Sequence, residues 1–154
     1  MQIALYQPDI PQNTGTILRL AACLDLKVHL IHPAGFNFST KLFRRTAMDY
    51  ADRVDLHEHD SFDRFESWRR HHGKRLLLLS TKASDNALAF SFLPGDILML
   101  GRESAGVPAH VADRVDQALR IPMKQDLRSL NVAMACALAL PRALHMTGGL
   151  SSLQ

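Results

Sequence analysis

The 154-residue chain has few of the residues that build disulfide-bonded or zinc-binding domains. It contains two cysteines, Cys23 and Cys136, which lie far apart without a CxxC motif or a cysteine–histidine cluster. This spacing is unlike that of structural zinc sites. We therefore expect both cysteines to be free thiols that are buried in apolar helical segments.

Long hydrophobic runs are also missing. The longest, residues 132–140, has about half of the ~20 apolar residues that a membrane-spanning helix needs. Residues 1–6 have neither a basic segment nor a long apolar core, so they indicate a first strand and not a signal peptide. These absences predict a cytoplasmic protein that does not enter a membrane.

Glycine-rich phosphate motifs and strong charge are absent as well. No GxGxxG occurs, and residues 101–108 lack the Gly-Lys-Ser/Thr ending of a P-loop, so ATP hydrolysis and the common dinucleotide fold have no motif support. The formal charge is only +3, although 13 of the 18 basic residues are arginine, which pairs well with phosphate. A nucleic-acid partner and a mere bias of genome composition are equally compatible with this charge.

The apolar residues that are present form short runs between helical stretches. Strand candidates are residues 3–6, 28–31, 76–79, 97–100 and 118–121. Two of these runs, 76–79 and 97–100, are apolar throughout, which is typical of central parallel strands covered by helices on both faces. The length and the 47% hydrophobic content predict one α/β domain over residues 1–154, with a loose tail from about residue 148.

Helical spacing of apolar residues predicts helices at 14–24, with Arg19 off the apolar stripe, and at 60–72, which Asp60 or Ser61 could cap. A last helix is expected to begin near Ser129. It is apolar almost all round to residue 140, so we expect the domain and a partner subunit to bury it together. Pro141 should bend or stop it.

Three loops rich in polar and turn residues follow candidate strands, at residues 7–15, 101–108 and 121–131. Ligands of open α/β sheets bind beyond the carboxyl ends of the strands, so these loops are candidate binding loops. Each also has an ordinary interpretation. Asn13 could simply cap a helix, as could Ser129 or Asn131, and the glycine-rich loop could be a plain turn.

A basic segment with aromatic neighbours is the best candidate for RNA contact. Lys41, Arg44 and Arg45 could follow a phosphate backbone, and Phe43 or Tyr50 could stack on a base. A solvated helix face is the alternative, as it is for the basic residues within 69–75. The sequence His57-Glu58-His59 looks like part of a metal site, but no third ligand is visible, so we predict no metal.

The order and spacing of the three loops resemble the SPOUT superfamily of RNA methyltransferases. The matching segments are Pro11-Gln12-Asn13-Thr14-Gly15 with Arg19, residues 101–108, Ile121-Pro122-Met123, and Arg128-Ser129-Leu130-Asn131. The closest resemblance is to SpoU-like, single-domain tRNA (cytidine/uridine-34)-2'-O-methyltransferases. It covers nearly the whole chain.

This resemblance implies a SPOUT-type α/β knot, in which a mostly parallel sheet has helices on both faces and the carboxyl-terminal part forms a deep trefoil knot. It implies a homodimer that methylates the ribose 2'-hydroxyl of the wobble pyrimidine of tRNA, in leucine isoacceptors. The methyl donor would be S-adenosyl-L-methionine, with S-adenosyl-L-homocysteine as product. The donor would contact Leu79, Gly101, Ile121, Met123, Ser129, Leu130 and Asn131.

The resemblance also assigns roles at the acceptor. Arg19 would activate or steady the ribose oxygen, and because arginine stays protonated we expect it to bind phosphate or stabilise the alkoxide. Asn13 would position Arg19 or the ribose, and Ser129 and Asn131 would orient donor and ribose. Glu103 would brace the glycine-rich loop. The residues Lys41, Arg44, Arg45 and Tyr50 would bind RNA.

The chain departs from the family pattern at Thr16, Arg102 and Ala105. Thr16 and Ala105 keep a second hypothesis open, an RNA-binding module that has the fold without the activity. Methylation of another tRNA or rRNA position is a further alternative, and the patterns alone would also allow a generic α/β protein that binds a small molecule. Binding of S-adenosylmethionine separates these classes.

Overall fold

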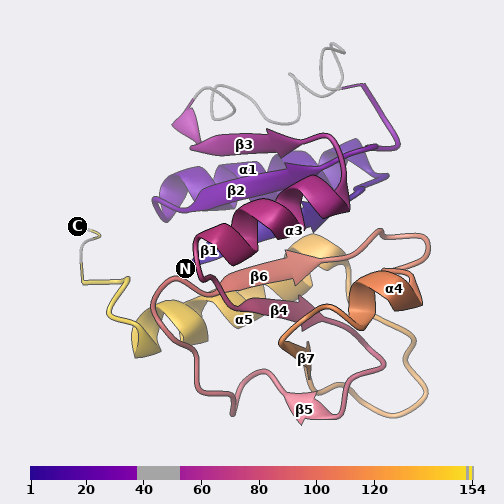
Figure 1. Ribbon diagram of the computed structural model, residues 1–154. Helices are drawn as coiled ribbons and strands as arrows, with labels where there is room; N and C mark the ends of the chain where they lie inside the picture. The colour runs from indigo at the N-terminus through magenta and orange to yellow at the C-terminus, as the bar shows by residue number, and fades with distance from the viewer. Residues whose placement is uncertain (38–52, 152, 154) are drawn as a thin grey trace.

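A parallel sheet forms the centre of the molecule. In the computed structural model, which describes residues 1–37, 53–151 and 153, its strands run in the order β3-β2-β1-β6-β4-β7-β5, and every pair is parallel (Figure 1). The strands are β1 (Gln2–Tyr6), β2 (Lys27–Ile31), β3 (Leu56–His59), β4 (Leu76–Leu79), β5 (Asp85–Asn86), β6 (Ile97–Leu100) and β7 (Gln117–Arg120). The helices are α1 (Pro11–Cys23), α3 (Phe62–His71), α4 (Ala109–Ala112) and α5 (Val132–Met146).

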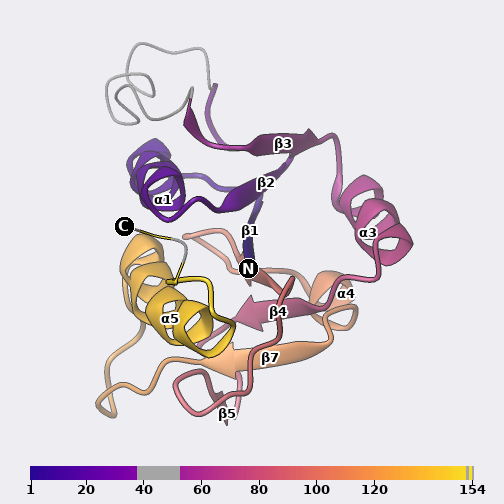
Figure 2. The same cartoon turned by 90° about the vertical axis from the view of Figure 1, so that its left-hand side faces the viewer.

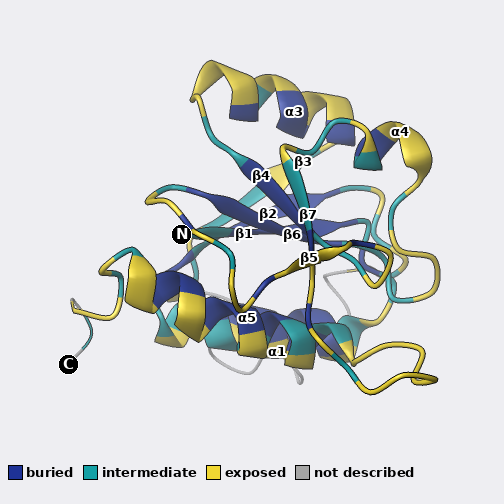
Figure 3. Ribbon diagram, turned by 90° about the horizontal axis from the view of Figure 1, so that it is seen from below, coloured by how far each residue is buried: buried dark blue, intermediate teal, exposed yellow. Residues whose placement is uncertain are grey.

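Helices cover both faces of this sheet, as the sequence predicted. Figures 2 and 3 show α1 and α5 on one face and α3 and α4 on the other. Strand β1 serves both layers because successive side chains point to opposite faces. Ile3 and Leu5 belong to the core beneath α1 and α5, whereas Ala4 and Tyr6 belong to the core beneath α3 and α4.

The central strands were predicted well and the edge strands were not. All four residues of β6 are buried, and β4 lies beside it, so the fully apolar runs are in the middle of the sheet. Predicted and observed bounds differ by at most one residue for five strands. The predictions missed β3 and β5 because their sequences, LHEH and DN, are short and largely polar, and both strands lie at the edges.

Helix α1 begins earlier than predicted, and its start corrects the capping interpretation. Pro11 occupies the first turn, and the residue before it, Ile10, gives no side-chain cap. Proline is favoured there because its missing amide hydrogen has no partner in the first turn. Asn13 therefore lies inside the helix, where its side chain is 9% exposed and available for contacts with other loops.

Helix α5 corrects a second expectation. Asn131 caps it, as foreseen for this residue, but Ser129 lies in the preceding loop and does not. The helix continues past Pro141 to Met146. A proline removes one backbone hydrogen bond, but the residues around it, Leu140 and Ala143, are fully buried against the core. Their packing holds the helix on the sheet.

The two cysteines differ in exposure. Both are free, and Cys136 is buried as expected, but Cys23 is exposed because it lies in the last turn of α1, off the buried face. Burial raises the pKa of the Cys136 thiol to about 12. No helix in the part of the chain that the structure describes is long and apolar enough to cross a membrane. The trefoil knot stays a prediction from the resemblance.

Candidate active site

The loops after β1 and β6 meet at the point where the strand order reverses, which is where open α/β sheets bind ligands. Asp9 joins them. Its backbone amide donates to Glu103 Oε2 at 3.0 Å, and the Glu103 amide donates to Asp9 Oδ1 at 3.1 Å. The Ser104 hydroxyl also donates to Asp9 Oδ2, and Arg102 Nε lies 3.8 Å from the same oxygen.

A line of hydrogen bonds continues from this pair into two helices. Asn13 Nδ2 donates to Glu103 Oε1 at 3.1 Å, and Asn131 Nδ2 donates to Asn13 Oδ1 at 2.8 Å. Asn131 Oδ1 in turn accepts from the backbone amides of Ala133 and Met134 at the start of α5. The structure thus brings together Asn13, Glu103 and Asn131, three of the predicted site residues, although Asn13 and Asn131 are far apart in sequence.

The two carboxyl groups of this cluster have opposite pKa shifts. Hydrogen bonding with the Glu103 side chain is the largest cause that lowers the pKa of Asp9 to about 2. Burial is the largest cause that raises the pKa of Glu103. Asp9 therefore carries the negative charge of the pair, and Glu103 takes up a proton first as the pH falls. The pair braces the two loops, because Asp9 and Glu103 exchange hydrogen bonds and Ser104 donates to Asp9.

The glycine-rich loop after β6 folds back on itself. Arg102 and Gly106 exchange backbone hydrogen bonds of 3.0 and 2.8 Å. A Cβ atom on Gly101 would lie 2.7 Å from the carbonyl carbon of Gly106, so any other residue would push the two strands of this turn apart. Gly106 itself has a φ of +67°, a conformation that favours glycine. The loop needs both glycines to reach Asp9.

The residues expected to hold the methyl donor lie at the carboxyl ends of three neighbouring strands. Leu79 ends β4, Gly101 follows β6 and Ile121 follows β7, and these three strands are neighbours. Met123, Ser129 and Leu130 come from the irregular loop that joins β7 to α5. All six residues therefore lie at the carboxyl ends of adjacent parallel strands or in the loops that follow them.

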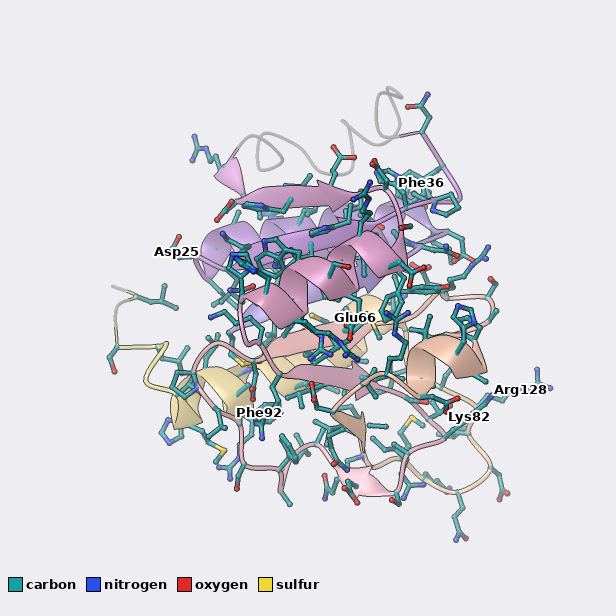
Figure 4. The ribbon with its side chains drawn as sticks, viewed as in Figure 1. Asp25, Phe36, Glu66, Lys82, Phe92 and Arg128 are labelled. Atoms are coloured by element: carbon teal, nitrogen blue, oxygen red, sulfur yellow. The ribbon has the colours of Figure 1, made fainter. Side chains whose placement is uncertain are left out.

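The irregular loop, residues 121–131, has the properties of a binding loop. Among the described residues, the Leu127 amide is the only one of this loop that donates a backbone hydrogen bond, to the Lys124 carbonyl. Leu127 is 64% exposed and Leu130 is 38% exposed, so the loop presents apolar side chains at its surface. Figure 4 shows Arg128, which belongs to this loop, at the outer surface on the side where the strands end.

Arg19 is not part of the Asn13 cluster within one chain. It is exposed on α1, six residues beyond Asn13, and a helix rises about 1.5 Å per residue, so its Cα lies about 9 Å farther along the axis. Asn13 bonds instead to Glu103 and Asn131. The RNA-binding predictions Lys41, Arg44, Arg45 and Tyr50 fall outside the described residues.

The second basic segment has a structural role. Arg69 is buried, and it donates to Glu66 and to Asp116 Oδ2 at 2.7 Å, while Arg75 pairs with the buried Asp96 at 2.6 Å. Figure 4 shows Glu66 at the lower side of α3, and Glu66 is buried. These charges surround a cavity of about 640 Å³ at the amino ends of the strands, away from the three loops. Arg69 and Arg75 therefore make ion pairs within the domain, whereas the side chain of Arg70 is 67% exposed.

The histidines of β3 gain a neighbour that the sequence did not reveal. His29 of β2 is fully buried beside them, and its ring lies within hydrogen-bonding distance of His59, with Nδ1 and Nε2 3.0 Å apart. Even so, no group of three or more His, Cys, Asp or Glu among the described residues could hold a metal ion. The cluster is instead packed under Phe65 and Trp68.

Sequence reasoning missed the role of Asp9. Its position in the first loop was visible, but nothing local indicated that it accepts hydrogen bonds from a loop that follows more than 90 residues later. One signal was available: Asp9 is the only carboxylate among residues 7–15. Arg102, a departure from the family pattern, contacts the same carboxylate, and its Nε is buried without a hydrogen bond among the described residues.

Comparison with known proteins matches this arrangement along nearly the whole chain. Over 149 residues, the chain is 53% identical to the tRNA (cytidine(34)-2'-O)-methyltransferase of Beijerinckia indica, covering 97% of this chain and 93% of that protein. It is 36% identical over 150 residues to the tRNA (cytidine(34)-2'-O)-methyltransferase of Escherichia coli K12, covering 96% and 94%.

Solved structures share the fold. A structure described as giving insights into the 2-OH methylation of C/U34 on tRNA has a TM-score of 0.89 and 39% identity, covering 94% of both chains. The SpoU methyltransferase AviRb of Streptomyces viridochromogenes, in complex with AdoMet, has a TM-score of 0.85 at 22% identity, covering 94% of this chain and 57% of that one. Residues 1–141 match the family described as SpoU rRNA Methylase, and the chain belongs to that family.

Proposed function

We propose that this protein is a tRNA (cytidine/uridine-34)-2'-O-methyltransferase, which methylates the ribose of the wobble nucleotide. The observation that carries the proposal is the 53% identity, over 97% of the chain, to a relative of that name. The cluster of Asn13, Glu103 and Asn131 at the switch point supports it, because the matching loops are also the loops that the fold brings together. A tRNA substrate implies a cytoplasmic enzyme.

The residues at the carboxyl ends of β4, β6 and β7 fit S-adenosyl-L-methionine. An adenosine needs an apolar surface and hydrogen-bonding groups. Loop 121–131 offers exposed leucines, and its described main-chain groups make one hydrogen bond with one another, from the Leu127 amide to the Lys124 carbonyl. Leu79, Gly101, Ile121, Met123 and Leu130 would hold the cofactor, with Ser129 beside them. When bound, S-adenosylmethionine supplies a methyl group on a sulfonium, and S-adenosylhomocysteine is the product.

The protein contributes to the reaction by orienting the ribose and by placing a positive charge near its oxygen. A ribose 2'-hydroxyl is a poor nucleophile, so its oxygen must be held in line with the methyl group. Arginine side chains carry a fixed positive charge, so in this proposal Arg19 binds the adjacent phosphate or stabilises the developing alkoxide. Asn13 is a positioning residue. Its amide is oriented by Glu103 and Asn131, so the wall of the site beside the ribose is rigid.

We also propose that the enzyme is a homodimer that forms through α5. Met134 is 57% exposed and Leu138 is 47% exposed, and residues four apart lie on the same face of a helix. A large apolar surface on a helix beside the site favours burial by a second copy. Because Arg19 is distant from Asn13 within one chain, a second copy could also complete the acceptor side.

Methyl transfer to tRNA tests the proposal. Purified protein, tritiated S-adenosylmethionine and tRNA from a strain that lacks the enzyme should give a 2'-O-methyl nucleoside at position 34, identified by mass spectrometry of nuclease fragments. Comparing leucine isoacceptors with other tRNAs would define the substrate set. Binding of the cofactor without transfer to any RNA would favour the inactive RNA-binding module, and methylation elsewhere would name another target.

A further inference from the structure

A second pocket lies at the carboxyl ends of β2 and β3, outside the residues assigned so far. It has a volume of about 540 Å³ and is lined by His32, Ala34, Gly35, Phe36, Asn37 and Glu58. Sites for small ligands usually have volumes of about 300–1,000 Å³. Figure 4 shows Phe36 on the same side of the molecule as Arg128, which is the side where the parallel strands end.

The pocket is joined to the candidate active site by direct contact. The Gly35 amide donates to the Pro8 carbonyl at 2.8 Å, and a Cβ atom on Gly35 would lie 2.8 Å from Asp9 Cβ. Asp9 is bonded to Glu103, which is bonded to Asn13. Neighbouring strands are about 4.8 Å apart, so the end of β2 lies about 10 Å from the end of β6. A nucleotide whose ribose lies over the end of β1 can place its base in the pocket.

The lining residues offer two contacts that suit a pyrimidine. Phe36 presents a half-buried aromatic ring, and base–aromatic stacking is a sequence-tolerant source of affinity. His32 Nε2 lies 2.6 Å from Glu58 Oε2 and can donate to it, which holds the carboxylate in place. Glu58 Oε1 makes no hydrogen bond with any described residue, and its side chain is 58% exposed.

We propose that this pocket binds the cytosine base of the nucleotide whose ribose is methylated, with Phe36 against the ring and Glu58 Oε1 accepting a hydrogen bond from the exocyclic amino group. The inference rests on the function proposed above. Carboxylates accept from the N4 amino group of cytosine, whereas uracil has a carbonyl oxygen at the equivalent position, which a carboxylate repels. Glu58 therefore favours cytidine over uridine.

Kinetics with two RNAs test the role of Glu58. Anticodon stem–loops that differ only in C34 or U34 are methylated by the wild-type protein, Glu58→Gln and the control Asp113→Asn, an exposed carboxylate at the opposite end of the sheet. The wild type and the control should prefer C34 by about fivefold or more in kcat/KM. Glu58→Gln should lose most of this preference, because an amide can donate as well as accept. An unchanged C34/U34 ratio in Glu58→Gln overturns the proposal, whereas a wild type inactive on both RNAs overturns the proposed function instead.

Equilibrium binding provides a readout that does not depend on catalysis. With S-adenosylhomocysteine present, Phe36→Leu should weaken binding of both stem–loops by about fivefold or more and leave the C34/U34 ratio unchanged. Leucine keeps the apolar contact with the core, and the melting temperature checks that the variant folds. Undiminished binding of both RNAs contradicts stacking on Phe36.

A third set of stem–loops identifies the bound base. Each keeps C34 and replaces one other loop cytosine by uracil. The effect of Glu58→Gln should persist in all of them. If it follows another cytosine, the assignment to the methylated nucleotide is wrong.

Discussion

Single residues decide how the two principal loops of the site are held. Asp9 accepts hydrogen bonds from the Glu103 amide and the Ser104 hydroxyl, and its own amide is bound by the Glu103 carboxylate. Glu103 in turn fixes the Asn13 amide. The orientation of Asn13 thus depends on the Asp9 carboxylate, which does not contact it directly. Loss of Asp9 should therefore disturb the side of the site that binds the ribose.

Asp9→Asn should lower both stability and activity. The new amide group replaces an acceptor that faces donors, and losing a hydrogen bond to a charged group costs about 1.5–3 kcal/mol. We expect a lower free energy of unfolding in urea and a kcat/KM reduced by about tenfold, with cofactor affinity less affected. Asp25→Asn makes the same chemical change at an exposed turn and should behave as wild type. Equal effects of the two variants would contradict a special role of Asp9.

Arg19→Ala should abolish methyl transfer and leave the affinity for S-adenosylmethionine nearly unchanged. The reason is its place on the exposed side of α1, away from the loops at the ends of β4, β6 and β7. Single-turnover kinetics and calorimetry measure the two quantities. Arg19→Lys, which keeps the charge but not the planar fork, should recover only part of the rate. Turnover at the wild-type rate in Arg19→Ala would remove this residue from the mechanism.

At the scale of elements, helix α5 has three roles. Its amino terminus is tied to the site through Asn131, its buried face packs against α1 and the sheet, and its exposed face carries Met134 and Leu138. The helix remains continuous through Pro141 because the buried residues on either side hold it. Asn131 therefore couples the stability of a helix to the geometry of Asn13.

Two substitutions of Asn131 separate these functions. Serine is a good helix cap but is too short to reach Asn13, whereas alanine can do neither. Asn131→Ala should lower the free energy of unfolding by about 0.5–2 kcal/mol. Asn131→Ser should be distinctly more stable than the alanine variant, yet equally impaired in kcat. If serine restored full activity, the bond to Asn13 would have no part in catalysis.

At the scale of the whole molecule, the exposed face of α5 should set the oligomeric state. Leu138→Glu places a charge on that face and should shift the protein from dimer to monomer in analytical ultracentrifugation, with activity lost in parallel. Leu93→Glu is the matched control, since Leu93 is 51% exposed but lies in the connection before β6. A wild-type protein that sediments as a monomer at micromolar concentration would contradict the proposed homodimer.

The buried histidine makes the fold sensitive to acid. Burial is the main cause that lowers the pKa of His29 to about 3, and the pKa of His59 is also lowered. Both histidines titrate normally when unfolded, so between about pH 6.5 and the folded pKa the unfolded state binds more protons. The contribution of these two histidines to stability should be constant above about pH 6.5 and fall below it, by roughly 1.4 kcal/mol per pH unit for each histidine that stays neutral.

Urea unfolding at pH 5, 6, 7 and 8 measures this dependence. His29→Gln keeps a polar side chain but cannot titrate, and it should flatten the slope below pH 6.5. His110→Gln, an exposed histidine on α4, should leave the slope unchanged. Equal slopes for wild type and His29→Gln would show that the acid sensitivity arises elsewhere.

Local pattern alone determined much of this protein. Four-residue apolar runs and helical spacing are properties of neighbouring residues, so the central strands, α1, α3 and α5 could be predicted, and the three loops followed from them. The resemblance added a chemical role for Asn13, Arg19 and the loop after β7.

Only the tertiary structure decided which polar groups meet. The bond between Asn13 and Asn131 and the contacts of Asp9 join distant segments, and no local signal encodes such a pairing. The same holds for β3 and β5, which are strands because a neighbour supplies their hydrogen bonds and not because of their own sequences. Pro141 is tolerated for a similar reason, since burial of the helix around it outweighs one missing hydrogen bond.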